Sequence, residues 1–125
     1  MILADTNIWI SYFKDKNKYP SITERLHERQ ISTHSWIVGE LMLGNLGPQR
    51  MDILSTLRII PHLPEYPTSE IQEFIQEEKL YGKGLSLIDV HLLYSSLRNH
   101  HALWTADKQL EWFARKFRCA HIDFH

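Results

Sequence analysis

The sequence predicts an α/β fold with a mainly parallel central sheet flanked by helices. Short apolar runs that fit buried strands alternate along the chain with longer segments in which apolar residues recur at helical spacing. The chain has 125 residues, of which 43% are hydrophobic, enough to build one core. We find no linker and no internal repeat, so we expect residues 1–125 to form a single domain.

The first half of the chain is expected to begin with a strand at 1–4. Asp5, Thr6 and Asn7 follow, and all three are residue types that favour a helix N-cap. Pro20 suits the first turn of a helix, and Ser35 suits the N-cap of another, which Gly47 would end. We therefore expect strands at 1–4, 31–33 and 58–60, and helices at 8–13, 20–30, 36–46 and 49–56.

In the second half, prolines 61, 64 and 67 break regular structure, and an amphipathic helix begins at Thr68 or Ser69. Its apolar stripe comprises Ile71, Phe74, Ile75 and Leu80. The glycines at 82 and 84 interrupt the helical pattern, and Ser86 suits the N-cap of the next helix. We expect helices at 87–99 and 108–117, and strands at 102–105 and 120–122.

The overall charge gives little support to a protein that coats nucleic acid. The formal net charge is -1, from 14 basic and 15 acidic side chains. Cys119 is the only cysteine, so no internal disulfide can form, as is usual in a reducing compartment. The N-terminus lacks the pattern of a signal peptide, and no apolar run approaches the roughly 20 residues that span a bilayer. We expect a cytoplasmic protein that does not enter a membrane.

Four acidic residues lie where burial is expected. Asp5 and Asp107 directly follow apolar runs, and ligands of open α/β sheets collect at the carboxyl ends of strands. Glu40 and Asp89 lie on the apolar faces of predicted helices. A buried carboxylate is costly unless it is paired or bound to a metal. Without these four acids the formal charge of the chain would be +3, which is compatible with an anionic substrate.

Helix capping is the alternative explanation for these acids. Asp89 lies in the first turn after Ser86, and Asp5 and Asp107 each precede a predicted helix. The agreement of four positions favours a metal site over capping alone. Oxygen ligands suit hard cations, so we expect Mg²⁺ or Mn²⁺, either of which can activate a water for attack on phosphorus.

Four short motifs contain these acids: 5–9 (DTNIW), 38–41 (VGEL), 85–89 (LSLID) and 105–108 (TADK). Together they resemble the PIN-domain nucleases, and most closely the VapC-like toxins of type II toxin–antitoxin systems. The resemblance covers nearly the whole chain and implies a single PIN-like domain.

The resemblance implies a metal-dependent endoribonuclease that hydrolyses RNA phosphodiester bonds with a metal-activated water. Its metal-binding acids match Asp5, Glu40, Asp89 and Asp107. Its polar positions beside the metal match Thr6 or Asn7, and Thr105. It also implies a homodimer and a cognate antitoxin protein that blocks the site.

Two other classes of protein also remain open from the sequence. A phosphotransfer module of the receiver type also places acids at strand ends, but it needs paired acids after the first strand, where this chain has Thr6 and Asn7. A non-catalytic domain that binds RNA or protein on a nuclease-like fold is the second class. Trp9, Tyr12, Trp36 and Trp112 are expected mainly in the core, although Trp9 and Tyr12 lie close enough to Asp5 to stack a base or contact an antitoxin.

Overall fold

A three-stranded parallel sheet forms the centre of the protein in the computed structural model, which describes residues 1–123. The strand order is β2-β1-β3, with β1 (Ile2–Ala4) between β2 (Ile31–Ser32) and β3 (Ala102–Trp104). Ile2 pairs with Ile31 on one side, and Ala4 pairs with Trp104 on the other. Because the strands are parallel, the residues that follow β1 and β3 lie at the same edge of the sheet.

The helices connect and cover these strands. Their bounds are α1 (Thr6–Lys14), α2 (Pro20–Glu28), α3 (Ser35–Leu43), η1 (Gly47–Gln49), α4 (Arg50–Ile59), α5 (Thr68–Glu78), α6 (Leu87–Asn99) and α7 (Lys108–Lys116). Within residues 1–123, no helix is long and apolar enough to cross a membrane.

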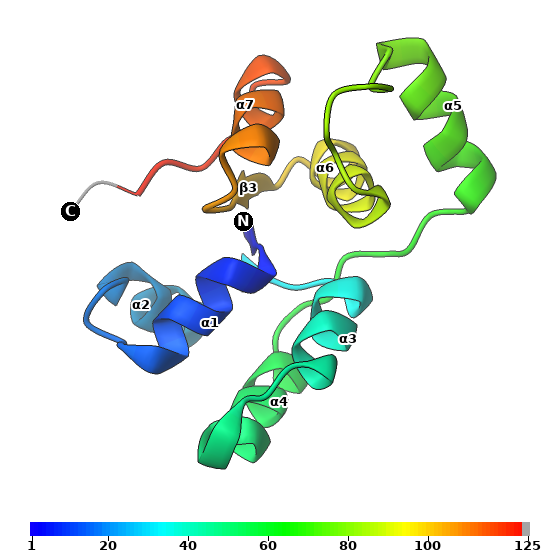
Figure 1. The fold of residues 1–125 in the computed structure, drawn as a ribbon. Coiled ribbons are helices and arrows are strands. Elements are labelled where there is room, and N and C mark those ends of the chain that lie inside the picture. The colour runs from blue at the N-terminus through cyan, green and yellow to red at the C-terminus, as the bar shows by residue number, and fades with distance from the viewer. Residues whose placement is uncertain (124–125) are drawn as a thin grey trace.

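The helices form two groups with the strands between them (Figure 1). α1 to α4 make up the lower half of this view, and α5 to α7 make up the upper half. The N-terminal ends of α1, α3 and α7 point toward the middle, and α6 is seen nearly end-on beside them. This arrangement confirms the α/β fold with a parallel sheet and brings several helix N-termini to one region.

The core is built on the strands and extends into both groups of helices. Leu3, Ile31 and Leu103 are 1% exposed or less. Ile22 from α2 and Leu92 from α6 are fully buried as well. A strand that helices bury on both faces has a continuous run of apolar residues. These short strands could therefore be recognised in the sequence.

The prediction of a strand at 58–60 is wrong. These residues end α4, because Ile53, Leu54 and Leu57 continue a helical stripe of buried side chains. Strand-like pairing occurs a few residues later, where Thr33 pairs with His62 in an isolated parallel bridge. The Thr33 N–H donates to Pro61 O at 2.9 Å, and Leu63 N–H donates to Thr33 O at 2.9 Å.

The closing strand expected at 120–122 is reduced to one isolated bridge between Ala120 and Leu103. Leu103 N–H donates to Cys119 O at 2.6 Å, and His121 N–H donates to Leu103 O at 2.9 Å. The segment therefore lies beside β3 in parallel but pairs at a single position. The helix expected at 36–46 is also shorter, since α3 ends at Leu43.

Replacing a buried leucine should destabilise the fold far more than replacing an exposed one. Leu92→Ala removes a side chain that is 0% exposed and should lower the free energy of unfolding by about 2–5 kcal/mol. Leu43 is 90% exposed, so the matched Leu43→Ala should change it by less than about 0.5 kcal/mol. Urea denaturation followed by circular dichroism measures both, and equal losses would contradict this core.

Candidate functional site

Asp5 is the buried carboxylate at the centre of the candidate site. It follows β1 directly, and its backbone N–H donates to Trp104 O at 2.8 Å, which continues the pairing with β3. Its side chain also caps α1, since Oδ1 accepts from Thr6 N–H at 2.7 Å. The residue is 6% exposed. The predicted strand followed by an N-cap residue is therefore present, and the N-cap residue is buried.

Thr105 links Asp5 to the loop after β3. Its hydroxyl donates to Asp5 Oδ2 at 2.8 Å, and it accepts from Asp107 N–H at 3.1 Å. Asn7 holds the same loop: its Oδ1 accepts from Ala106 N–H at 3.0 Å, and its Nδ2 lies 3.4 Å from Thr105 Oγ1. The polar positions at 7 and 105 thus fix the ends of β1 and β3 against each other.

Glu40 is joined to the site through Thr6. The Thr6 hydroxyl donates to Glu40 Oε1 at 2.8 Å, which connects the first turn of α1 to the second turn of α3. Glu40 is half-buried, and its Oε2 accepts no hydrogen bond from residues 1–123. Thr6 therefore orients this carboxylate and leaves one of its oxygens available.

Asp89 closes a capping box at the start of α6. Its Oδ2 accepts from Ser86 N–H at 3.1 Å, while Ser86 Oγ accepts from Asp89 N–H at 3.1 Å. The capping explanation is therefore correct for Asp89. It does not exclude a second role, because Asp89 is half-buried and its charge acts on Asp5.

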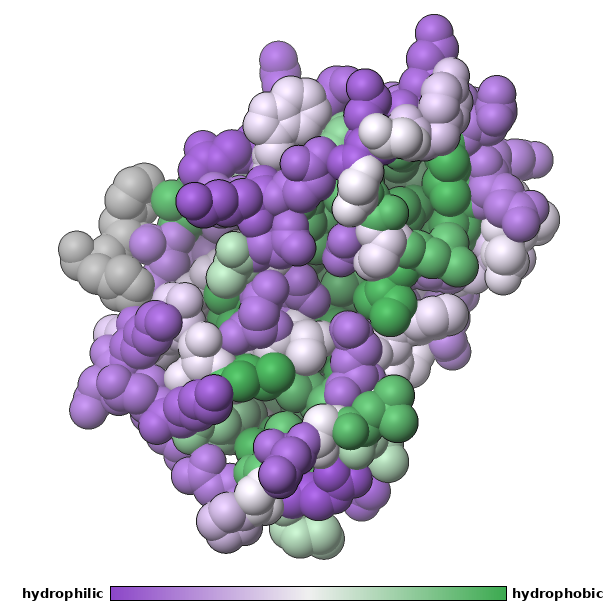
Figure 2. Space-filling model, in the orientation of Figure 1, coloured by the Kyte–Doolittle hydropathy of each residue, from purple (hydrophilic) through white to green (hydrophobic). Residues whose placement is uncertain are grey.

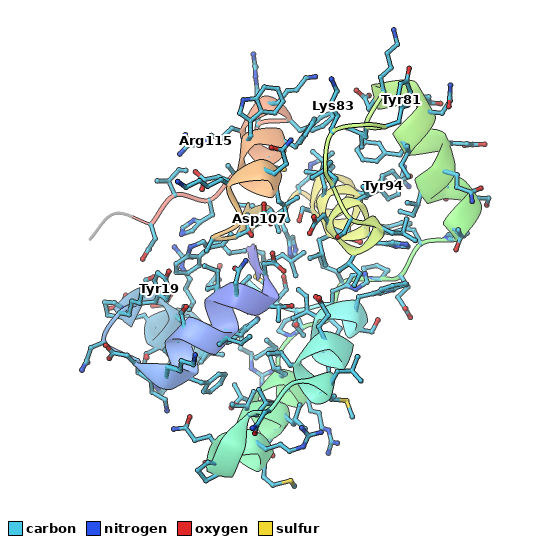
Figure 3. All side chains as sticks on the ribbon, in the orientation of Figure 1. Tyr19, Tyr81, Lys83, Tyr94, Asp107 and Arg115 are labelled. Carbon is cyan, nitrogen blue, oxygen red and sulfur yellow. The ribbon has the colours of Figure 1, made fainter. Side chains whose placement is uncertain are left out.

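Asp107 differs from the other three acids. It is exposed and caps α7, with Oδ1 accepting from Gln109 N–H at 2.9 Å and from Leu110 N–H at 3.0 Å. Figure 3 shows it at the start of α7, near the middle of the molecule. Its charge is not among those that shift the pKa of Asp5. Its backbone is tied to the site through Thr105, while its carboxylate acts first as a helix cap.

The position of α3 depends on His34, which takes the N-cap role expected for Ser35. His34 has extended backbone angles, and its Nδ1 accepts from Trp36 N–H at 3.1 Å. The side chain is 0% exposed, and burial lowers its pKa, which keeps Nδ1 unprotonated and able to accept. A capping histidine was not recognised because His is not a usual N-cap residue, and the sequence shows Ser immediately after it.

Carboxylates crowd around Asp5 without a compensating cation. Burial raises the pKa of Asp5 above its ordinary value; the hydrogen bonds from Thr105 and Thr6 oppose this, and the charges of Asp89 and Glu40 add to it. The ion pairs of residues 1–123 are Arg115–Glu111 and His121–Asp123, and neither includes any of the four acids. No cationic side chain of residues 1–123 therefore pairs with these acids.

The donor chemistry of this cluster fits a hard divalent cation. It offers carboxylate oxygens from Asp5, Glu40 and Asp89, with hydroxyl groups beside them and no sulfur or imidazole donor bonded to them. Within residues 1–123, no group of three or more His, Cys, Asp or Glu side chains lies close enough together to hold a metal ion by itself. Mg²⁺ sites commonly use only one or two carboxylates, with water and substrate phosphates completing the shell.

The aromatic residues are placed differently from the sequence-based expectation. Trp9 and Tyr12 are core residues at 0% and 3% exposed, so neither can stack a base or contact a partner. Trp36 and Trp112 were expected in the core as well, and that expectation is wrong: they are 36% and 57% exposed. Trp36 lies four residues before Glu40, on the same face of α3, and this spacing is the sequence signal that could have linked it to the site.

Lys83 lies apart from Asp107 in Figure 3, toward the top of the view between α7 and α5. Its backbone carbonyl accepts from Gln109 Nε2 at 2.6 Å. The glycines on either side have φ of +69° and +80°, which glycine adopts without strain, so the segment is a defined turn. The backbone of Lys83 therefore contacts the beginning of α7, and its ammonium group takes no part in this contact.

Comparison with known proteins gives one relative of clear similarity. Ribonuclease VapC32 of Mycobacterium tuberculosis, found in two strains of that species, is 31% identical over 112 residues, which cover 89% of this chain and 88% of the relative. No family model matches the sequence.

Among solved structures, PAE2754 from Pyrobaculum aerophilum matches with a TM-score of 0.63 at 14% identity. The match covers 94% of this chain and 96% of that one, and at this identity it supports the fold alone. The extent and identity of the VapC32 match establish the family. The chain belongs to the VapC family of PIN-domain ribonucleases.

Proposed function

We propose that this protein is a Mg²⁺- or Mn²⁺-dependent endoribonuclease that acts as the toxin of a toxin–antitoxin pair. The observation that best supports the proposal is the buried Asp5 carboxylate, next to Glu40 and Asp89, with no basic partner in residues 1–123. A buried, uncompensated carboxylate cluster is costly unless a cation binds there. The similarity to a named ribonuclease favours RNA as the substrate over the phosphotransfer alternative.

In this proposal Asp5, Glu40 and Asp89 hold the cation, and Asp107 lies at the entrance. Each of the first three has an oxygen or a lone pair left over after its hydrogen bonds to the protein. Asp107 has Oδ2 left over, since both of its capping bonds use Oδ1. The protein's part is to hold these oxygens at fixed positions before RNA arrives.

Thr6, Asn7 and Thr105 act as positioning residues for these acids. Thr6 orients Glu40, Thr105 orients Asp5, and Asn7 holds the loop from 105 to 107. When bound, a divalent cation supplies positive charge for the phosphate oxygens and lowers the pKa of a water molecule. Asp5, Glu40 and Asp89 would hold this cation, and a carboxylate oxygen not bound to it would accept the proton of that water.

A cognate antitoxin and a second copy of the chain are the proposed protein partners. Large apolar side chains lie exposed on α1 and α4, where Ile10 is 38%, Met51 70% and Ile59 74% exposed. Exposed apolar side chains gathered on neighbouring helices are typical of surfaces that bind proteins. Apolar surface among the helices of the lower half of the molecule is visible in Figure 2.

The proposal predicts metal-dependent cleavage of RNA that is lost on changing Asp5. Purified protein should cut unstructured RNA with Mg²⁺ or Mn²⁺ and not with EDTA. Asp5→Asn keeps the size of the side chain and an oxygen for Thr6 N–H, but it removes a charge, so cleavage should fall at least about a hundredfold.

Asp52→Asn is the matched control for this assay, because Asp52 is exposed on α4 and takes no part in the site. It should cut at the wild-type rate. Undiminished cleavage by Asp5→Asn would remove Asp5 from the reaction. Absence of cleavage by the wild-type protein with every RNA and metal would favour a non-catalytic binding domain.

The raised pKa of Asp5 predicts a specific pH dependence of stability in EDTA. In the folded protein Asp5 keeps its proton to a higher pH than in the unfolded chain. The contribution of Asp5 to the free energy of unfolding therefore falls as the pH rises from its unfolded pKa to its folded pKa. Relative to wild type, Asp5→Asn should therefore gain free energy of unfolding as the pH rises above about 4. Urea denaturation of both proteins across this range measures the difference, and two parallel pH profiles would refute the raised pKa.

A further inference from the structure

A groove of about 700 Å³ runs along α3. Glu40 lines this groove and is also joined to Asp5 through Thr6, so the groove meets the acidic cluster at Glu40. Trp36, Gly39, Met42 and Leu43 line it from α3, and Ile88 lines it from the first turn of α6.

Trp36 presents a rigid aromatic surface in the groove. Its indole stacks on the imidazole of His91, with ring centroids 4.7 Å apart and planes inclined by 20°. His91 is 4% exposed, so it forms a fixed support for the indole. Trp36 is 36% exposed and lines the groove, while His91 stacks on one face of its indole.

Gly39 leaves room beside this indole. It lies one helical turn after Trp36, and a Cβ added to it would meet nothing within 4 Å. Its φ is not in the positive region, so the backbone does not require glycine here. Glycine inside a helix costs about 1 kcal/mol relative to alanine, and here it leaves the groove wide next to Trp36.

The charges of the groove favour a neutral ring over a phosphate next to Trp36. Glu40 and Glu65 both line it, and Arg50 is its only cation among the described residues. Arg50 is held in place because its guanidinium donates to Met42 O at 3.0 Å and Gly44 O at 3.5 Å. A guanidinium has five N–H donors, so Arg50 can still contact one phosphate of a strand while the base lies against the indole.

We propose that this groove binds an unpaired nucleobase of the RNA strand next to the cleaved phosphate, stacked on Trp36. The inference rests on the proposed ribonuclease function and adds to it the mode of substrate binding. Every nucleobase has a flat π-surface, and stacking on an aromatic side chain is worth about 1–3 kcal/mol per base. Trp36 is thus a substrate-positioning residue that favours an unpaired base, since a paired base must first leave its stack at a cost of about a few kcal/mol.

Binding measured without cleavage tests this directly. Fluorescein-labelled homo-oligoribonucleotides and an abasic strand of the same length are titrated with protein in EDTA, and anisotropy gives each dissociation constant. Wild-type protein should bind the strands with bases about tenfold more tightly than the abasic strand. Trp36→Leu should lose that preference, because Leu retains apolar volume but has no ring, while its affinity for the abasic strand stays the same.

Two further variants separate stacking from a change in folding. Trp36→Phe should restore most of the preference for bases, because phenylalanine also offers a flat ring. Trp112→Leu removes another exposed tryptophan at a position that does not line the groove, and it should behave as wild type. In cleavage assays Trp36→Leu should raise KM with little change in kcat, since the acids are untouched.

The proposal is overturned if wild-type protein binds abasic and base-bearing strands equally. It is also overturned if Trp36→Leu keeps the preference for bases, or loses affinity for both kinds of strand alike. In those cases the apolar lining fits a protein segment better than RNA. Because binding is measured in EDTA, these outcomes differ from a failure of the ribonuclease proposal, which is read from the wild-type cleavage assay.

Discussion

The hydrogen bond from the Thr105 hydroxyl to Asp5 Oδ2 joins the two strand ends on which the candidate site is built. It spans 2.8 Å between residues that follow neighbouring parallel strands, and it orients a carboxylate that is 6% exposed. Thr6 extends the same connection to Glu40 on α3. The sheet therefore determines where Asp5 lies, and short hydroxyl side chains determine how the nearby acids are oriented.

Three of the four acids also stabilise helix N-termini. Asp5 caps α1, Asp89 completes a capping box on α6, and Asp107 caps α7. Capping and cation binding are compatible because a carboxylate has about four lone-pair positions and the caps use only some of them. A helix N-terminus also has a partial positive charge, which lowers the cost of gathering acids at one place. Glu40 is the exception, since it lies within α3 and depends on Thr6 for its orientation.

The fold could be predicted from the sequence where apolar runs are buried on both sides, as at 1–4 and 102–105. Prediction failed where pairing depends on distant residues. The stretch at 58–60 was expected to form a strand, but α4 continues to Ile59 because its side chains pack at helical spacing. Likewise, residue 120 pairs with Leu103 at one position only, which no local pattern encodes.

The acids of the candidate site could be recognised in the sequence because acidic residues are unusual on apolar faces. The sequence identified Asp5, Glu40 and Asp89, and the structure places the charges of Glu40 and Asp89 near Asp5. Capping of α7 by Asp107 was one of the two interpretations that the sequence left open, whereas capping of α3 by His34 was missed because it depends on backbone geometry. Trp36 was misjudged for a related reason: its spacing from Glu40 suggested a buried face, whereas this face borders an open groove.

The central claim is that Asp5, Glu40 and Asp89 together bind a divalent cation, and a thermal melt with and without metal tests it most directly. Scanning calorimetry of wild-type protein in EDTA and in millimolar Mn²⁺ should show the melting temperature rise by at least about 4 °C with metal, since a cation that binds only the folded state stabilises it. Asp5→Asn should melt at the same temperature in both conditions. A wild-type melting temperature that does not respond to Mn²⁺, or an equal rise in Asp5→Asn, would contradict the account.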